Sequence, residues 1–236
     1  MKIITLDTIG STNDYCLSNA ELLLEHGTVV RAREQTKGKG RFGRNWVSSA
    51  GKDLTLSLIY HPNTNNVKIH TATVLTGLAV RRALNSIAHH TFAIKWPNDI
   101  LYNMKKICGI LVERATVSDQ DVLVIGIGIN INTEPKNLYP GATSLYDITG
   151  TEMDIDLVFE NVIDEVTSLL RDMTLDTRLV AEWNGASPFN GTEVSFTQDN
   201  SIQKGILSGI NSDGSITIIT SDNREIRYTG EIDYAR

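Results

Sequence analysis

Cysteine is scarce in this chain, which has two cysteines, Cys16 and Cys108, among 236 residues. They form no Cys-x-x-Cys pair, and the five histidines show no metal-ligand spacing, which argues against a zinc-ribbon or disulfide scaffold. The first residues lack the apolar run of a signal peptide, and no window approaches the roughly 20 apolar residues of a membrane span. These absences predict a reduced, cytoplasmic protein without a membrane partner.

An excess of positive charge is also absent. The chain has 22 Lys and Arg against 28 Asp and Glu, which gives a formal net charge of −6. This balance argues against a general nucleic-acid binder, because such proteins present a basic surface to the phosphates. The length suits one large domain with a small one beside it.

Basic residues do gather in one glycine-rich segment, GKGRFGRNW at 38–46. Its three glycines, within six residues, let the backbone adopt positive φ and approach a ligand closely. Such a segment suits binding of a polyanion and closure over a reactive intermediate. Four cations lie within eight residues here: Lys37, Lys39, Arg41 and Arg44.

The glycine spacing also matches the dinucleotide-binding fingerprint, which requires a strand before it and a helix after it. Here more loop follows, and the next apolar segment, 54–60, has the pattern of a strand. The kinase motifs that accompany a similar glycine pattern do not occur downstream. An ordinary basic surface loop stays open as an alternative on this segment alone.

Three further motifs accompany the loop: Lys-Trp-Pro-Asn-Asp at 95–99, KKICGILVE at 105–113 and VIGIGIN at 124–130. Near the N-terminus stands Gly-Ser-Thr-Asn-Asp at 10–14. In this order, these segments resemble the biotin protein ligases. The resemblance runs from about Ser11 to the C-terminus and is strongest before Asn132.

The hydrophobic pattern predicts an α+β fold. Strands are expected at 3–6, 28–32, 54–60 and 92–96, and 107–113 and 122–129 should form an antiparallel hairpin. Helices are expected after 11–12 and at 69–88, 156–170 and 175–183. Four short strands between 194 and 228 suggest a small barrel.

The resemblance implies a catalytic domain at 1–186, with a central mixed and largely antiparallel sheet flanked by helices. It also implies an SH3-like C-terminal barrel at 187–236.

The reaction implied by the resemblance has two steps. The biotin carboxylate attacks the α-phosphate of ATP, which gives biotinyl-adenylate and pyrophosphate. A lysine of a biotin carboxyl carrier domain, part of a biotin-dependent carboxylase, then attacks the mixed anhydride. Both steps gather negative charge around one phosphorus, so cations and a bound Mg²⁺ are expected to stabilise them. The metal ligands are left open.

The resemblance assigns the catalytic cation to Lys106, which is expected to contact the biotin carboxyl and the phosphate. Lys105 is the alternative, because a one-residue slip would point the side chain to the other face of the sheet. Arg41 matches the phosphate-binding arginine of the family. Arg44 and Trp46 are expected near the adenylate, although the indole of Trp46 could instead anchor the loop.

The biotin ureido ring is expected to contact Ser11, Thr12 and Asn13, although one of them is also expected to cap the following helix. Asp99 is expected to orient or deprotonate the carrier lysine or to hold Mg²⁺ through water. Asn130 is expected near the nucleotide or Mg²⁺. Lys39 stands where the family usually has arginine, which puts planar bidentate contacts there in doubt. The remaining predicted biotin contacts are Gln35, Gly38, Lys39, Gly40, Gly109, Gly126 and Gly128.

Two relatives of this chemistry stay as alternatives. Lipoate–protein ligases share the architecture, but the glycine-rich loop favours biotin. Some family members repress transcription through an added N-terminal DNA-binding domain. Only ten residues precede Ser11, so no nucleic-acid partner is expected. A homodimer is among the assemblies considered, and the sequence does not decide it.

Overall fold

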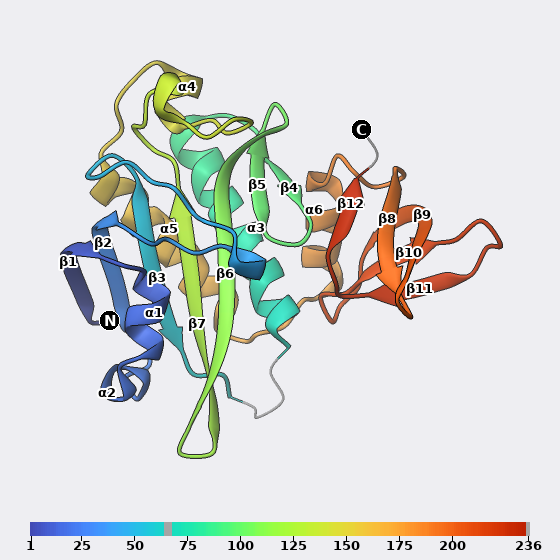
Figure 1. Cartoon of the computed structure of the whole chain (residues 1–236), viewed down its shortest axis with the longest axis horizontal. Coiled ribbons are helices and arrows are strands. Elements are labelled where there is room, and N and C mark those ends of the chain that lie inside the picture. Colours follow the sequence, from blue (N-terminus) through green and yellow to red (C-terminus); the bar gives the residue numbers. More distant parts are fainter. Residues whose placement is uncertain (64–67, 235–236) are drawn as a thin grey trace.

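A seven-stranded mixed sheet forms the centre of the computed structural model, which describes residues 1–63 and 68–234 (Figure 1). Its strand order is β1-β2-β3-β7-β6-β5-β4, with β1 and β2 parallel and every other pair antiparallel. The predicted mixed, largely antiparallel sheet is therefore confirmed. The strands are β1 (Ile3–Ile9), β2 (Val29–Gln35), β3 (Leu54–Tyr60), β4 (Ala93–Lys95), β5 (Asp99–Tyr102), β6 (Lys105–Val117) and β7 (Gln120–Ile129).

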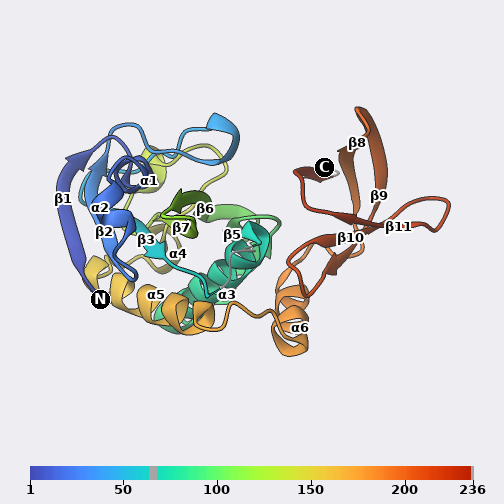
Figure 2. The same ribbon diagram turned by 90° about the horizontal axis from the view of Figure 1, so that it is seen from below.

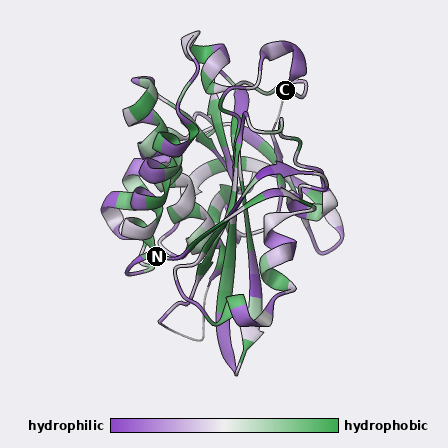
Figure 3. Ribbon diagram, turned by 90° about the vertical axis from the view of Figure 1, so that its left-hand side faces the viewer, coloured by the Kyte–Doolittle hydropathy of each residue, from purple (hydrophilic) through white to green (hydrophobic). Residues whose placement is uncertain are grey.

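The two faces of the sheet differ in what covers them, because successive side chains of a strand point to opposite faces. One face packs on the long helices α3 (Ile69–Ala88) and α5 (Ile155–Leu170), which lie together beneath it in Figure 2. The strands are strongly hydrophobic along this core (Figure 3). The other face carries the short helices α1 (Thr12–Leu17) and α2 (Ala20–Leu23) at one end and is otherwise open to the glycine-rich loop.

The strand register brings the small and polar residues of the open face into two rows. In one row, Thr55 pairs with Gly128, which pairs with Gly109, which pairs with Asp99. In the neighbouring row, Ser57 pairs with Gly126, and Gly126 pairs with Leu111. The even-numbered residues of β3 and the odd-numbered residues of β7 point into the helical core instead.

The C-terminal unit is a five-stranded antiparallel sheet in the order β11-β10-β9-β8-β12. No pairing joins β11 to β12 within residues 1–63 and 68–234, so the sheet does not close into the barrel expected from the sequence. Helix α6 (Thr177–Ala186) lies between this unit and the central sheet (Figure 1). The strands are β8 (Glu193–Gln198), β9 (Ser201–Ile210), β10 (Ile216–Ile219), β11 (Glu225–Tyr228) and β12 (Ile232–Tyr234).

Trp96 joins the C-terminal unit to the central sheet. Its indole Nε1 donates to the carbonyl of Gly230 at 3.2 Å, and its own carbonyl accepts from the Tyr234 hydroxyl at 3.0 Å. Its ring also packs edge-on against that of Trp183 in α6. Two aromatic residues of the C-terminal part of the chain thus reach the motif at 95–99.

Most predicted elements are confirmed, and two have the predicted bounds: β3 at 54–60 and α3 at 69–88. The strands β5 and β12 were not predicted. The sequence does not predict β5 because Pro97 and the polar Asn98-Asp99 pair, at its start, are typical of a turn. The remaining short elements are α4 (Leu145–Thr149) and two 3₁₀ turns, Arg41–Gly43 and Pro135–Asn137. Within the described ranges, no helix is both long and apolar enough to cross a membrane.

Candidate functional site

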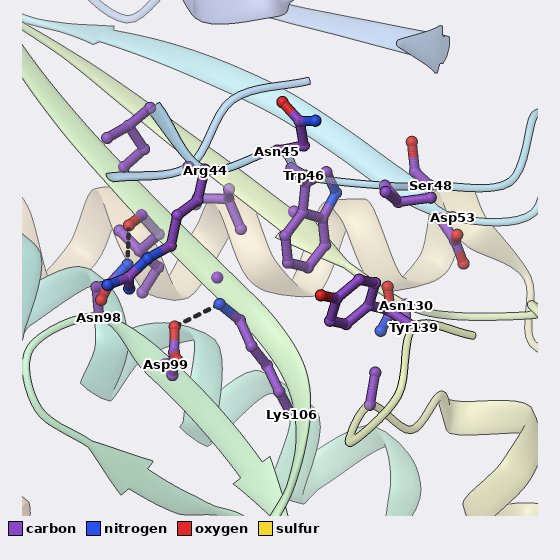
Figure 4. A pocket seen from close by; sticks show the side chains of 18 of the residues that line it. Arg44, Asn45, Trp46, Ser48, Asp53, Asn98, Asp99, Lys106, Asn130 and Tyr139 are labelled. Carbon is purple, nitrogen blue, oxygen red and sulfur yellow. Dashed lines mark hydrogen bonds and ion pairs between the residues drawn. The ribbon is translucent and has the colours of Figure 1, made fainter. Parts of the chain in front are cut away.

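A cavity of about 840 Å³ opens on the face of the sheet that the glycine-rich loop crosses. Its floor is formed by β5, β6 and β7, and its walls by α1, the loop and the segment after β7 (Figure 4). All the residues that the sequence predicted for the site line this cavity except Gly38. The tertiary structure therefore brings together segments that are up to 119 positions apart, from Ser11 to Asn130.

The glycine-rich loop folds back on itself like a short hairpin. Gly40 N donates to Arg44 O at 2.7 Å, and Trp46 N donates to Gly38 O at 2.9 Å. At its tip Phe42 adopts φ 54°, which L residues rarely occupy. Gly38 contributes a close approach of two backbones rather than a cavity wall, because a Cβ there would lie 2.5 Å from Trp46 O.

Trp46 lies flat over the glycines of the sheet. A Cβ at Gly128 would meet the indole at 2.4 Å, and one at Gly109 would meet it at 3.0 Å. These two glycines thus make room for the ring of Trp46, the anchoring role that the sequence left open. Its Nε1 is buried and has no hydrogen-bond partner among the described residues, so it is a donor without an acceptor on the cavity floor.

Two of the loop cations are paired with acidic residues outside the loop. Lys39 Nζ lies 2.7 Å from Asp14 Oδ2 in α1, and Arg44 Nη1 lies 2.7 Å from Glu231 Oε1 in the C-terminal unit. Arg41 forms no ion pair with any residue in 1–63 or 68–234. Burial lowers the pKa of its guanidinium, which lies 5.1 Å from the centroid of the Phe42 ring.

Lys106 and Asp99 form an ion pair at the floor of the cavity, with Lys106 Nζ 2.6 Å from Asp99 Oδ1 (Figure 4). A β-bulge in β6 places Lys106 there, because Ile100 pairs with Cys108 but the next residue, Leu101, pairs with Lys106. The additional residue returns Lys106 to the face that carries Gly109. Lys106 Nζ would lie 3.1 Å from a Cβ at Gly109.

Lys105 is excluded from the cavity by the same bulge. Its side chain is 58% exposed, and its Nζ lies 3.8 Å from Asp147 Oδ2. The geometry therefore distinguishes the two neighbouring lysines, which the sequence alone left as alternatives.

The Ser-Thr-Asn segment lies buried at the opposite end of the cavity. Ser11 is the N-cap of α1 and accepts from Asp14 N, as expected for one member of the trio. Thr12 N donates to Gln35 Oε1 at 2.7 Å. Asn13 lies over Gly126, where a Cβ would come within 2.4 Å of its Oδ1. Gly126 thus makes room for a protein side chain, as Gly128 does for Trp46.

Asn98 and Asn130, which both line the cavity, are held by main-chain groups. Asn98 Nδ2 donates to Ile110 O at 2.8 Å, and Asn130 Nδ2 donates to Thr143 O at 2.9 Å. Both shape the cavity, and Asn130 also ties the end of β7 to the segment that forms its rim.

Asp53 is a buried carboxylate that the sequence analysis missed. It accepts from Ser49 N at 2.8 Å, from Ile131 N at 2.9 Å and from Thr133 Oγ1 at 2.7 Å. Burial raises the pKa of this carboxyl group, whereas the three hydrogen bonds lower it. Asp53 joins the end of the glycine-rich segment to the end of β7, and no sequence motif marks it.

The C-terminal unit also contributes to the cavity wall through Phe189 and Tyr234. Lys95 Nζ lies 4.8 Å from the ring centroid of Tyr234 and 5.9 Å from that of Phe189. The sequence motif at 95–99 marked Lys95, but only the fold shows what surrounds it.

A metal site built from protein ligands alone is not seen in the described ranges, where no three His, Cys, Asp or Glu residues come together. The cavity is lined by two carboxylates, Asp53 and Asp99. Asp99 Oδ1 is buried and accepts no hydrogen bond from the described residues, so it contacts Lys106 as an ion pair.

Comparisons with known proteins agree with this site. The sequence model of the biotin/lipoate A/B protein ligase family matches residues 6–130. The bifunctional ligase/repressor BirA of Bacillus spizizenii is 32% identical over 98% of this chain and 73% of its own length. The biotin–[acetyl-CoA-carboxylase] ligase of Mycobacterium tuberculosis is 32% identical over 76% of this chain and 64% of its own length.

A solved structure extends the similarity to the whole chain. The biotin protein ligase from Aquifex aeolicus in complex with biotin and ATP superimposes with a TM-score of 0.83 and 30% sequence identity. The match covers all of this chain and 99% of the other. The glycine-rich loop, Lys106 and the cavity therefore lie within a fold that the two proteins share over their whole length. This chain therefore belongs to the biotin/lipoate A/B protein ligase family.

Proposed function

We propose that this chain is an ATP-dependent biotin–protein ligase. It activates biotin to biotinyl-5′-AMP with release of pyrophosphate, and it transfers biotin to a lysine of a biotin carboxyl carrier domain. The observation that carries the proposal is one cavity with a buried polar end at Thr12 and Gln35 and a cationic end at Lys106 and Arg41.

The polar end suits a cyclic urea. Such a ring has N–H donors beside a carbonyl acceptor, and burying it without partners for both would be costly. Thr12 and Gln35 supply a hydroxyl and an amide there, and Ser11 caps α1 so that the segment is held in place. Lys39 and Gly40 of the glycine-rich loop also line the cavity.

The cationic end suits the reacting phosphate. Lys106 is placed to hold the biotin carboxylate and the α-phosphate together, and it neutralises charge that develops as the carboxylate attacks. Arg41 supplies a second, bidentate cation whose charge no protein carboxylate satisfies in the described ranges. The flat indole of Trp46 and the cation of Arg44 lie on the nucleotide side.

Asp99 takes the role of orienting the amine of the carrier lysine, because it shares the cavity floor with Lys106. Asp99 would also hold Mg²⁺ together with substrate phosphates, which is the usual coordination of this ion, whereas both oxygens of Asp53 already accept hydrogen bonds from the protein. When bound, Mg²⁺ would supply positive charge to the phosphates of ATP.

The two structural units correspond to two domains. Residues 1–186 form the catalytic domain, and residues 187–236 form a C-terminal domain that reaches the cavity through Phe189 and Tyr234. The macromolecular partner is the biotin carboxyl carrier domain of a carboxylase. Nucleic acid is not among the proposed partners, since the chain has a net charge of −6.

The test is biotin-dependent exchange of radioactive pyrophosphate into ATP, because only an adenylate-forming enzyme returns label to ATP. Exchange with biotin and not with lipoate would support the proposal. Exchange with lipoate alone, or binding of biotin without any exchange, would refute it.

Replacing Arg41 with glycine is expected to loosen the closed loop more than it perturbs the biotin end of the cavity. Loss of the unpaired cation removes the contact that holds the loop to the adenylate, and glycine raises the entropy of the open loop. The adenylate then escapes and acylates lysines without selection. The measurement is biotin incorporated into a bystander protein per adenylate formed, compared with wild type.

The matched control is Lys37→Gly, which removes a cation at the exposed start of the same segment. It should retain the adenylate as wild type does. If Arg41→Gly labels the bystander no faster than Lys37→Gly, Arg41 does not hold the loop closed.

A further inference from the structure

Asn13 uses its whole side-chain amide on protein partners. Its Nδ2 donates to Leu111 O at 3.2 Å and to Glu113 Oε2 at 2.8 Å. A main-chain carbonyl and a carboxylate can only accept, so both amide hydrogens of Asn13 point at them. The Oδ1 atom is thereby turned toward Ser57 on β3, and the amide has no hydrogen left for a ligand.

The orientation of Asn13 also fixes the direction in which the Ser57 hydroxyl donates its hydrogen bond. This hydroxyl is completely buried and lies 2.5 Å from Asn13 Oδ1 and 2.7 Å from Thr12 Oγ1. A hydroxyl has one proton, and an amide oxygen has none to offer, so the proton of Ser57 goes to Asn13. The contact between Ser57 and Thr12 is then satisfied only if Thr12 directs its own proton to Ser57.

The result is a defined pattern at the polar end of the cavity. Gln35 Oε1 accepts from Thr12 N at 2.7 Å, and its Nε2 lies near Gly38, where it would be 3.1 Å from a Cβ. The contact of Gln35 Oε1 with Thr12 Oγ1, at 3.1 Å, is longer than the 2.7 Å contact between Thr12 Oγ1 and Ser57 and competes less for the Thr12 proton. The cavity is therefore offered an acceptor at its polar end, Thr12 Oγ1.

We propose that Ser57 and Glu113 are positioning residues that set the direction of the hydrogen bonds with which Thr12 selects a ligand N–H. The proposal rests on the proposed function and refines it. Neither residue lines the cavity, so each acts through Asn13 or Thr12 and not by touching the substrate. Asn13, which lines the cavity and is expected from the sequence to contact biotin, is the middle of a hydrogen-bond relay that runs from Glu113 through Asn13 and Ser57 to Thr12.

A urea fits the pattern because it presents N–H beside C=O. A cyclic carbamate with oxygen in place of one ureido N–H has nearly the same shape but places lone pairs against Thr12 Oγ1. The relay makes this mismatch costly, since Thr12 cannot turn its proton to the carbamate without leaving two oxygens of the relay 2.7 Å apart with no proton between them.

The experiment measures the Kd of biotin and of both carbamate analogues, one for each ring nitrogen, by titration calorimetry. In wild type the analogue that faces Thr12 should bind much more weakly than biotin. Ser57→Ala removes the acceptor of the Thr12 proton, so Thr12 can donate to the carbamate. The Kd of the analogue that faces Thr12, divided by the Kd of biotin, should therefore fall by about tenfold, a difference of about 1.4 kcal/mol. Glu113→Gln should keep the wild-type ratio, because its side-chain oxygen can still accept from Asn13.

Thr55→Val is the matched control. Thr55 is buried on the same strand and face as Ser57, but its hydroxyl donates to Ala32 O at 3.0 Å and takes no part in the relay. A ratio in Ser57→Ala equal to that in Thr55→Val would overturn the relay while leaving biotin binding established. If wild type bound no biotin and catalysed no pyrophosphate exchange, the proposed function would fail and the relay with it.

Discussion

Lys106→Ala is expected to abolish biotin-dependent pyrophosphate exchange while leaving the fold intact. The Lys106 ammonium is the cation at the floor of the cavity, and its replacement also leaves the carboxylate of Asp99 without its 2.6 Å partner. Loss of one charge aimed at the reacting phosphate costs roughly 3–4 kcal/mol of transition-state stabilisation, on the order of several hundredfold in rate. The rate of exchange at saturating biotin and ATP measures it.

Lys105→Ala provides the control for this variant. It removes the same charge from the neighbouring position, but its side chain is exposed and pairs with Asp147 outside the cavity. Exchange within about twofold of wild type is expected, as for an exposed ion pair of small energy. If Lys106→Ala retained exchange and Lys105→Ala lost it, the placement of Lys106 by the bulge would be wrong.

Asp53→Ala is expected to lower the free energy of unfolding by about 3–5 kcal/mol, the loss typical when a buried hydrogen-bonded network is broken. The variant leaves two main-chain N–H groups, of Ser49 and Ile131, without their acceptor. The carboxylate also holds the end of the glycine-rich segment against the end of β7. Urea unfolding followed by circular dichroism gives the change, provided that the slope with denaturant is unchanged.

Asp172→Ala, which truncates an exposed aspartate beyond α5, is the comparison. It should stay within about 0.5 kcal/mol of wild type, as is usual for surface positions. Equal stability of the two variants would contradict the structural role of Asp53. Asp53→Asn is expected to fall between them, because one amide oxygen can replace only part of the carboxylate.

Several features of this protein follow from its sequence alone. Apolar residues at helical spacing predict α3, and the run at 54–60 predicts β3, because these patterns match the geometry of one element each. The glycine-rich loop and the motifs at 95–99, 105–113 and 124–130 predict the family, since their residues cluster within short stretches.

Other features depend on contacts between segments that are distant in the chain. The strand β5 exists because residues 99–102 pair with β6, which overrides the local preference of Asn98-Asp99 for a turn. The barrel expected at the C-terminus is an open sheet, because closure depends on how its first and last strands meet and not on their number.

For the cavity, too, the sequence determines some features and the tertiary structure determines others. The sequence determined which residue types are available: a strand lysine, loop cations, glycines on β6 and β7, and a Ser-Thr-Asn segment. Only the tertiary structure decided their roles. A single bulge places Lys106 rather than Lys105 in the cavity, and packing of the loop and of α1 on the sheet places Trp46 and Asn13 over the glycines of β6 and β7. Leu111 O and Glu113 Oε2 accept both hydrogens of the Asn13 amide, because hydrogen-bond polarity depends on the partners that the fold supplies.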